Sequence, residues 1–211
     1  MDDYRPTVFI VDDDPAVRES MSLLMASAGL ASRAFSSAAD FLTAYEVGTP
    51  GCLVLDVRMP GISGTELQER LDGMGADVPI VFLTAYADVP VAVGAVRAGA
   101  VDFLTKPVEA DHLLERVRDA LRLDLSRRER RAEEDRARRR LEALTNRERE
   151  VLRYVIAGHT NKSIAKTLGL SRRTVETHRA NIRRKIGATS IPELVRAAAA
   201  AGMENGKSGP G

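Results

Sequence analysis

Short runs of apolar residues punctuate the first half of the chain. The clearest are TVFIV at 7–11, GCLVL at 51–55 and PIVFLT at 79–84, and weaker runs lie at 30–35 and 101–105. The three clear runs do not alternate with polar residues, which is typical of strands covered on both faces. We therefore expect five strands in a parallel sheet that is buried on both sides.

Segments with helical spacing separate these runs. Pro15 and Pro90 lie where the first turn of a helix tolerates proline. Gly29 and Gly99 follow two of the segments as C-terminal caps do. Five strand–helix repeats within about 120 residues predict a doubly wound α/β domain with a five-stranded parallel sheet. The predicted helices are Pro15–Ala28, Ser37–Tyr45, Ser63–Leu71, Asp88–Ala98 and Glu109–Leu121.

The second half of the chain has a different pattern. Residues 122–140 are almost wholly charged and contain no glycine or proline, which favours a solvated helical connector. A coiled coil that contributes to dimerisation remains open, although charged residues interrupt its candidate seam. From Leu141 the pattern is entirely helical, and a polar, glycine-rich tail follows Met203. The predicted domains are 1–122, a charged helical linker at 123–140, a helical domain at 141–203 and a disordered tail at 204–211.

Charge separates the two halves more sharply than the totals suggest. The 211 residues are 44% hydrophobic and 29% charged, enough for two ordinary domains, and the net charge is only +1. Residues 1–123 nevertheless carry 10 Lys and Arg against 19 Asp and Glu, while the remaining 88 residues carry 21 against 11. The basic half is therefore expected to meet a polyanion.

The sequence also bears on location. The single cysteine, Cys52, lies in an apolar run and is interpreted as a buried side chain in a reducing compartment. The acidic start does not resemble a signal peptide. No stretch approaches the ~20 apolar residues of a membrane span. These features predict a soluble, cytoplasmic protein.

Acidic side chains follow two of the predicted strands. The tripeptide DDD at 12–14 comes directly after the first run, and Asp56 comes directly after the run at 51–55. The next two strands end near Thr84 and Lys106. Ligands of open parallel sheets bind at the carboxyl ends of the strands. We therefore expect three of the acids to converge there, with a hydroxyl and an ammonium beside them.

Such a cluster predicts a particular chemistry. Like charges held together need a cation among them, and oxygen ligands with several waters suit Mg²⁺. With the metal, Asp56 becomes a candidate nucleophile that forms an aspartyl phosphate, Lys106 neutralises the phosphoryl oxygens and Thr84 donates a hydrogen bond to one of them. Each residue alone is more simply a turn acid, a surface lysine or a strand-end threonine. Their joint placement at four strand ends indicates a site.

The stretches IVDDD, LVLDVRMPGISG, VFLTAYAD and AGAVDFLTKP resemble the receiver domain of two-component response regulators, over about residues 5–122. The resemblance implies a flavodoxin-like sheet with strand order 2-1-3-4-5. It implies that Asp13 binds Mg²⁺ directly, that Asp12 binds it mainly through water, and that Asp56 accepts the phosphoryl group.

The same resemblance assigns further roles. The backbone carbonyl of Arg58 completes the protein's share of the metal shell, and Thr84 and Lys106 contact the phosphoryl group. Phe103 occupies the position of a switch aromatic, although plain core packing is the alternative. The bond between Lys106 and Pro107 is expected to be cis.

A helix, a short turn and a second helix follow in the basic half. Asn161–Leu168 leads through Gly169 to Ser171, a predicted N-cap, and then to a helix at Arg172–Ile186 rich in Arg and Lys. This arrangement is typical of helix-turn-helix DNA readers, although a helical bundle with a solvated basic face would show the same pattern. The sequence from LTNREREVL to NIRRKIG resembles the LuxR-type helix-turn-helix over residues 141–202. The whole chain thus resembles response regulators of the NarL/FixJ type, in the FixJ-like branch.

This second resemblance implies a DNA-reading surface. Glu176 and Ala180 stand where some relatives use lysines, and Glu176 is left open between accepting from a cytosine amino group and repelling the backbone. The last helix, in 191–202, is expected to pair two DNA-binding domains. The expected readers of base edges are Arg173, Thr177 and Arg179, and the expected phosphate contacts are Lys162, Arg172 and Arg184.

Together the resemblances imply a transcriptional regulator and not an enzyme. A sensor histidine kinase phosphorylates Asp56, the receivers pair through a surface with Val93, Arg97 and Asp102, and the dimer binds double-stranded promoter DNA as an activator with RNA polymerase as a partner. The alternative is a LuxR-type regulator that acts without phosphorylation. An aspartate-based phosphatase would need a second acid at residue 58, where arginine stands.

Overall fold

The computed structural model describes residues 4–85 and 88–200. The tail expected at 204–211 lies outside the described residues. The chain divides into a first compact unit that ends at Arg128 and a second that begins at Glu129. The sequence had suggested that the first domain ends six residues earlier. Each unit is described by itself.

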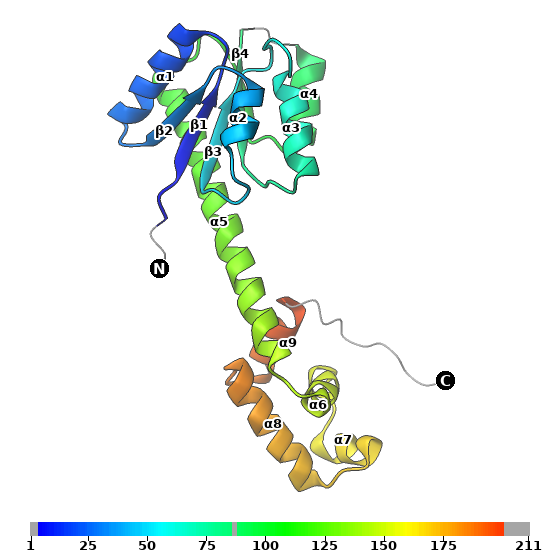
Figure 1. Ribbon diagram of the computed structural model, residues 1–211. Helices are drawn as coiled ribbons and strands as arrows, with labels where there is room; N and C mark the ends of the chain where they lie inside the picture. The colour runs from blue at the N-terminus through cyan, green and yellow to red at the C-terminus, as the bar shows by residue number, and fades with distance from the viewer. Residues whose placement is uncertain (1–3, 86–87, 201–211) are drawn as a thin grey trace. The chain divides into compact units, whose positions relative to one another are not determined.

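The first unit is built on a five-stranded parallel sheet with strand order β2-β1-β3-β4-β5 (Figure 1). Both the doubly wound fold and the strand order are as predicted. Helices α2, α3 and α4 pack on one face of the sheet, and α1 and the start of α5 pack on the other. The strands are β1 (Thr7–Val11), β2 (Ala31–Phe35), β3 (Gly51–Leu55), β4 (Ile80–Thr84) and β5 (Asp102–Thr105). The helices are α1 (Pro15–Ser27), α2 (Ala38–Ala44), α3 (Gly64–Gly73), α4 (Val89–Arg97) and α5 (Ala110–Glu142).

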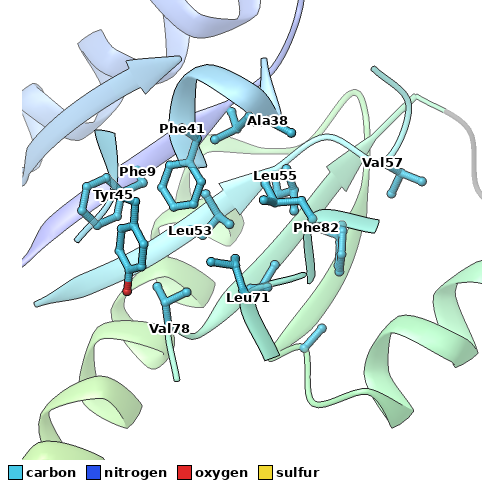
Figure 2. Packing of buried hydrophobic residues seen from close by; sticks show 14 of the residues in the cluster. Phe9, Ala38, Phe41, Tyr45, Leu53, Leu55, Val57, Leu71, Val78 and Phe82 are labelled. Carbon is cyan, nitrogen blue, oxygen red and sulfur yellow. The ribbon is translucent and has the colours of Figure 1, made fainter. Parts of the chain in front are cut away.

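Burial on both faces explains the unbroken apolar runs. Every residue of β3 is buried, and its successive side chains enter opposite halves of the core. Leu53 and Leu55 join the half beneath α2 and α3, where Phe41 and Tyr45 stack with ring centroids 4.9 Å apart (Figure 2). Cys52 enters the other half, and burial raises the pKa of its thiol. A strand of this kind cannot alternate because neither face meets water.

One charged residue beyond the expected domain end is part of the first unit. Asp124, on α5, is only 2% exposed. Its carboxylate accepts hydrogen bonds from Tyr4 Oη at 3.0 Å, Gly51 N at 3.0 Å and Arg128 Nε at 2.8 Å. Arg128 also donates to the backbone carbonyl of Gly48 at 2.7 Å. The buried carboxylate therefore ties the continuing helix to the amino-terminal edge of the sheet.

We expect Asp124→Ala to destabilise the first unit by about 2–4 kcal/mol, because it leaves buried donors and a guanidinium without their acceptor. Urea unfolding of the full chain, followed by circular dichroism, measures the loss. Asp72→Ala is the matched control, since Asp72 is exposed on α3 and should change stability by less than about 0.5 kcal/mol. Equal stabilities for the two variants would show that the Asp124 contacts contribute nothing.

The second unit contains the end of α5 and four further helices around one core. Leu152, Ile164 and Ile182 are among its fully buried side chains. Helix α7 ends at Gly169, whose φ of +65° lets the chain turn sharply, and the Ser171 side chain caps α8 by accepting from Thr174 N. The predicted helical fold is confirmed. The helices are α6 (Asn146–Ile156), α7 (Asn161–Leu168), α8 (Arg172–Ile186) and α9 (Ile191–Ala200).

A contact between α6 and α8 positions α8 within this unit. Thr145 and Glu148 form a reciprocal capping box at the start of α6. Glu148 is buried and also accepts from Lys185 Nζ, on α8, at 2.7 Å.

Within 4–85 and 88–200, no helix combines the length and apolar character needed to cross a membrane.

Candidate functional site

Three carboxylates meet at the carboxyl edge of the sheet. Strands β1 and β3 run side by side and in register, with Val11 opposite Leu55, so the chain leaves both strands at the same point. Asp12 and Asp13 follow β1, and Asp56 follows β3. One carboxylate oxygen from each of the three acids lies within 4.8 Å of the others. The convergence expected from the sequence is therefore present in the structure.

The cluster is partly closed to water. Asp12 is 1% exposed and Asp56 is 9% exposed, whereas Asp13 faces solvent. All three offer oxygen ligands only, and two nearly buried anions so close together favour a cation among them. The pocket is therefore compatible with a hard divalent metal ion. Asp12 and Asp56 directly follow the interior strands β1 and β3 and are covered, whereas Asp13 is one residue further along its loop and is exposed.

The lysine that directly follows β5 lies against these acids. Lys106 Nζ is 2.5 Å from Asp12 Oδ2 and 3.4 Å from Asp56 Oδ2. Its backbone N–H donates to the carbonyl of Thr84 at 2.8 Å, which holds the end of β5 beside β4. The bond from Lys106 to Pro107 is cis, as predicted. The cation is thus held within reach of both the buried acids.

Burial and charge act in opposite directions on this ion pair. Burial raises the pKa of the Asp12 carboxyl, and the hydrogen bond from Lys106 opposes that shift. Burial alone would lower the pKa of the Lys106 ammonium, but the carboxylates of Asp12 and Asp56 outweigh it and raise that pKa. Lys106 therefore stays protonated at neutral pH.

The three consecutive acids at 12–14 have different tasks. Asp14 begins α1 as its N-cap, and its Oδ1 accepts from Ala16 N at 2.8 Å. Asp12 Oδ1 accepts from Asp14 N at 3.0 Å, and the Asp12 carbonyl accepts from Arg18 Nη1 at 2.8 Å. The sequence analysis did not assign this cap, although the proline directly after Asp14 could have indicated it. No comparable signal marked Arg18, which holds the loop from within α1.

The remaining residues predicted for this site lie around it. Thr84 is fully buried at the end of β4. Phe103 is half-buried on β5 and packs against Phe82, with ring centroids 5.9 Å apart. The backbone N–H of Arg58 donates to Asp56 Oδ1 at 3.4 Å, so the segment after β3 folds back over the acid.

The predicted pairing surface is exposed in part. Val93 and Arg97 face solvent on α4. Asp102, on β5, is half-buried; its carboxylate accepts from Phe103 N at 2.7 Å and lies 4.0 Å from Arg116 Nε. Asp102 thus has partners within its own chain.

The second unit presents a basic helix. Most of the DNA contacts predicted from the sequence are exposed, whereas Arg179 is half-buried and its Nη1 donates to Asn161 Oδ1, on α7, at 2.8 Å. Sequence reasoning missed this contact because it joins residues 18 positions apart. The exposed residues are Lys162 on α7 and Arg172, Arg173, Thr177 and Arg184 on α8.

Comparison with known proteins identifies both units. Residues 8–118 match the family model of the response regulator receiver domain, and residues 142–198 match that of bacterial regulatory proteins of the luxR family. The chain belongs to the response regulators. It is thus a transcriptional regulator with a receiver and a LuxR-type DNA-binding domain and not an enzyme, as the sequence predicted.

Similar response regulators match over most of their length. The chain is 46% identical to the transcriptional regulatory protein FixJ of Azorhizobium caulinodans, over 93% of each chain. It is 43% identical to the response regulator protein TodT of Pseudomonas putida, over 93% of this chain and 86% of TodT. Among solved structures, the response regulator StyR is 44% identical with a TM-score of 0.84, covering 92% of this chain and 98% of StyR. Full-length FixJ from B. japonicum is 40% identical with a TM-score of 0.57, covering 95% and 99%.

Proposed function

We propose that this response regulator controls transcription through reversible phosphorylation of Asp56 by a sensor histidine kinase. The observation that carries the proposal is the meeting of Asp12, Asp13, Asp56 and Lys106 at one edge of the sheet. An Asp56 carboxylate oxygen attacks the phosphorus of the phosphohistidine. The P–N bond breaks as the P–O bond forms, and the electron pair leaves with the imidazole nitrogen.

Each neighbour has a task in this transfer. Asp12, Asp13, Asp56 and the backbone carbonyl of Arg58 would hold Mg²⁺, which neutralises charge on the phosphoryl oxygens when it is bound. Lys106 would supply a second positive charge, and its Nζ already lies 3.4 Å from Asp56 Oδ2. Asp56 retains some exposure, so a phosphoryl donor can reach it.

The added phosphate would act on the surface of α4 and β5. The phosphoryl group carries about two negative charges and three strong acceptors, to one of which Thr84 would donate. Movement of Thr84 would open space for Phe103 to turn inward and so repack that surface. A change in the ratio of active to inactive protein from 1:99 to 99:1 needs about 5.5 kcal/mol, and dimerisation can contribute part of this free energy.

Exposed apolar side chains support pairing of two receivers through α4. Val89, Val93 and Val96 are all exposed, and their spacing places them along one side of the helix. Arg97 and Asp102 would then pair across the interface. Two receivers joined there would bring two helix-turn-helix domains to adjacent half-sites of promoter DNA, with RNA polymerase as the partner of an activator.

The contacts of the second unit are part of the proposal. Lys162, Arg172 and Arg184 would grip phosphates, and Arg173 and Thr177 would reach base edges. Arg179 would contact DNA and would also hold Asn161 in place through its hydrogen bond. The receiver, linker and DNA-binding domains are proposed near the boundaries that the sequence indicated, with the linker helix anchored through Asp124.

Sedimentation velocity tests the proposed route. At micromolar concentration with acetyl phosphate and Mg²⁺, we expect the wild-type protein to pass from monomer to dimer. Val93→Asp should remain monomeric although it is phosphorylated, because it places a desolvated charge in the interface. Val47→Asp, at an exposed valine away from α4, should dimerise normally. A fully phosphorylated wild-type protein that sediments as a monomer would contradict this route.

A further inference from the structure

A single carboxylate stands on the basic recognition helix. Glu176 is the only acidic residue in the sequence of α8, which also carries five arginines and a lysine. The side chain is exposed, three positions after Arg173. A surface that must approach a polyanion therefore keeps one negative charge near its centre, although the phosphates of DNA would repel that charge.

The structure holds this carboxylate through a neutral amide. Arg179 Nη1 donates to Asn161 Oδ1 at 2.8 Å. With its oxygen held by Arg179, the amide of Asn161 presents its nitrogen to Glu176. That nitrogen lies 3.5 Å from Glu176 Oε1 and donates to it. An arginine thus orients an asparagine, and the asparagine orients the glutamate. Glu176 keeps a defined position without having its charge neutralised by an ion pair in this chain of contacts.

The chemistry of duplex DNA limits what Glu176 can contact. An ionised carboxylate only accepts hydrogen bonds, whereas phosphate and most groove atoms are acceptors as well. The donors in the major groove are the amino groups of cytosine and adenine. Beside its amino group adenine presents N7, an acceptor that would face the second carboxylate oxygen. The cytosine base has no such acceptor on its major-groove edge, so it suits a carboxylate better.

We infer that Glu176 is a specificity-determining residue that reads a cytosine in each half-site. The inference rests on the proposed placement of α8 in the major groove. At a half-site with cytosine at that position, the carboxylate exchanges water for an amino donor. At other bases it is desolvated against acceptors, which costs binding energy and rejects the site. Asn161 and Arg179 are positioning residues for this contact.

Selection from a randomised duplex library tests the inference with the full-length, phosphorylated protein. The wild type should enrich sites with cytosine at one position of each half-site. Glu176→Gln keeps the shape but pairs with the N6 and N7 atoms of adenine, so it should lower the cytosine preference there by about tenfold or more and favour adenine. Other positions should not change. Glu142→Gln, the same substitution at an exposed site on α5, should enrich the wild-type motif.

Arg173→Ala separates failure of the inference from failure of its premise. Suppose that Glu176→Gln enriches the wild-type motif, whereas Arg173→Ala no longer binds DNA or loses a base preference. Then α8 reads DNA but Glu176 does not, and the inference is overturned. If both variants enrich the wild-type motif, or the wild type enriches none, the placement of α8 is wrong and the inference falls with it. Matching thermal unfolding of Glu176→Gln and the wild type excludes misfolding.

Discussion

Replacing Asp56 with asparagine should abolish phosphorylation of the protein. Asparagine keeps the size of the side chain but lacks the anionic oxygen that attacks phosphorus. We expect the wild type to take up label from radioactive acetyl phosphate in the presence of Mg²⁺ and Asp56→Asn to take up none. Intact mass measurement of the same samples gives an independent readout.

Two controls make this result specific. Asp72→Asn removes an equivalent charge from an exposed position on α3 and should be labelled like the wild type. Chelating Mg²⁺ should suppress labelling of the wild type, because the carboxylates of Asp12 and Asp13 beside Asp56 repel the incoming phosphoryl group unless a metal ion lies among them. Stoichiometric labelling of Asp56→Asn would show that another residue is the acceptor.

The cluster of Asp12, Asp13 and Asp56 could be predicted from the sequence because the rule behind the prediction is geometric. Parallel neighbouring strands end at the same edge, so acids that follow β1 and β3 must meet when the two strands are in register. The fully buried β3 was predicted at its observed bounds for a related reason, since an unbroken apolar run leaves little choice. The strand β2 gave a weaker signal because it lies at the edge of the sheet, where Arg33 is exposed.

Contacts between distant residues could not be predicted in this way. The charged pattern around Asp124 indicated a helix, yet its burial depends on Tyr4, which is 120 positions away. The bond from Arg179 to Asn161 likewise depends on how α7 packs on α8. In both cases the sequence shows a charged side chain, and only the fold decides whether that side chain meets water or a partner.

Phosphorylation should also raise the affinity for DNA. A dimer engages two half-sites at once, so we expect the phosphorylated protein to bind a two-site duplex roughly 10²- to 10⁴-fold more tightly than the unphosphorylated protein. The affinity of both forms should fall steeply with salt, because the exposed cations of α7 and α8 displace counterions from DNA. The dimer should show the steeper dependence because it makes twice as many phosphate contacts.

Titration of a fluorescent two-site duplex, with and without acetyl phosphate, measures whether phosphorylation of Asp56 governs DNA binding. We predict that the donor strengthens binding by the wild type at least about a hundredfold and leaves the weak binding of Asp56→Asn unchanged. Equal affinity of the wild type in both conditions, with phosphorylation verified by mass, would contradict the account and favour a LuxR-type regulator that acts without phosphorylation.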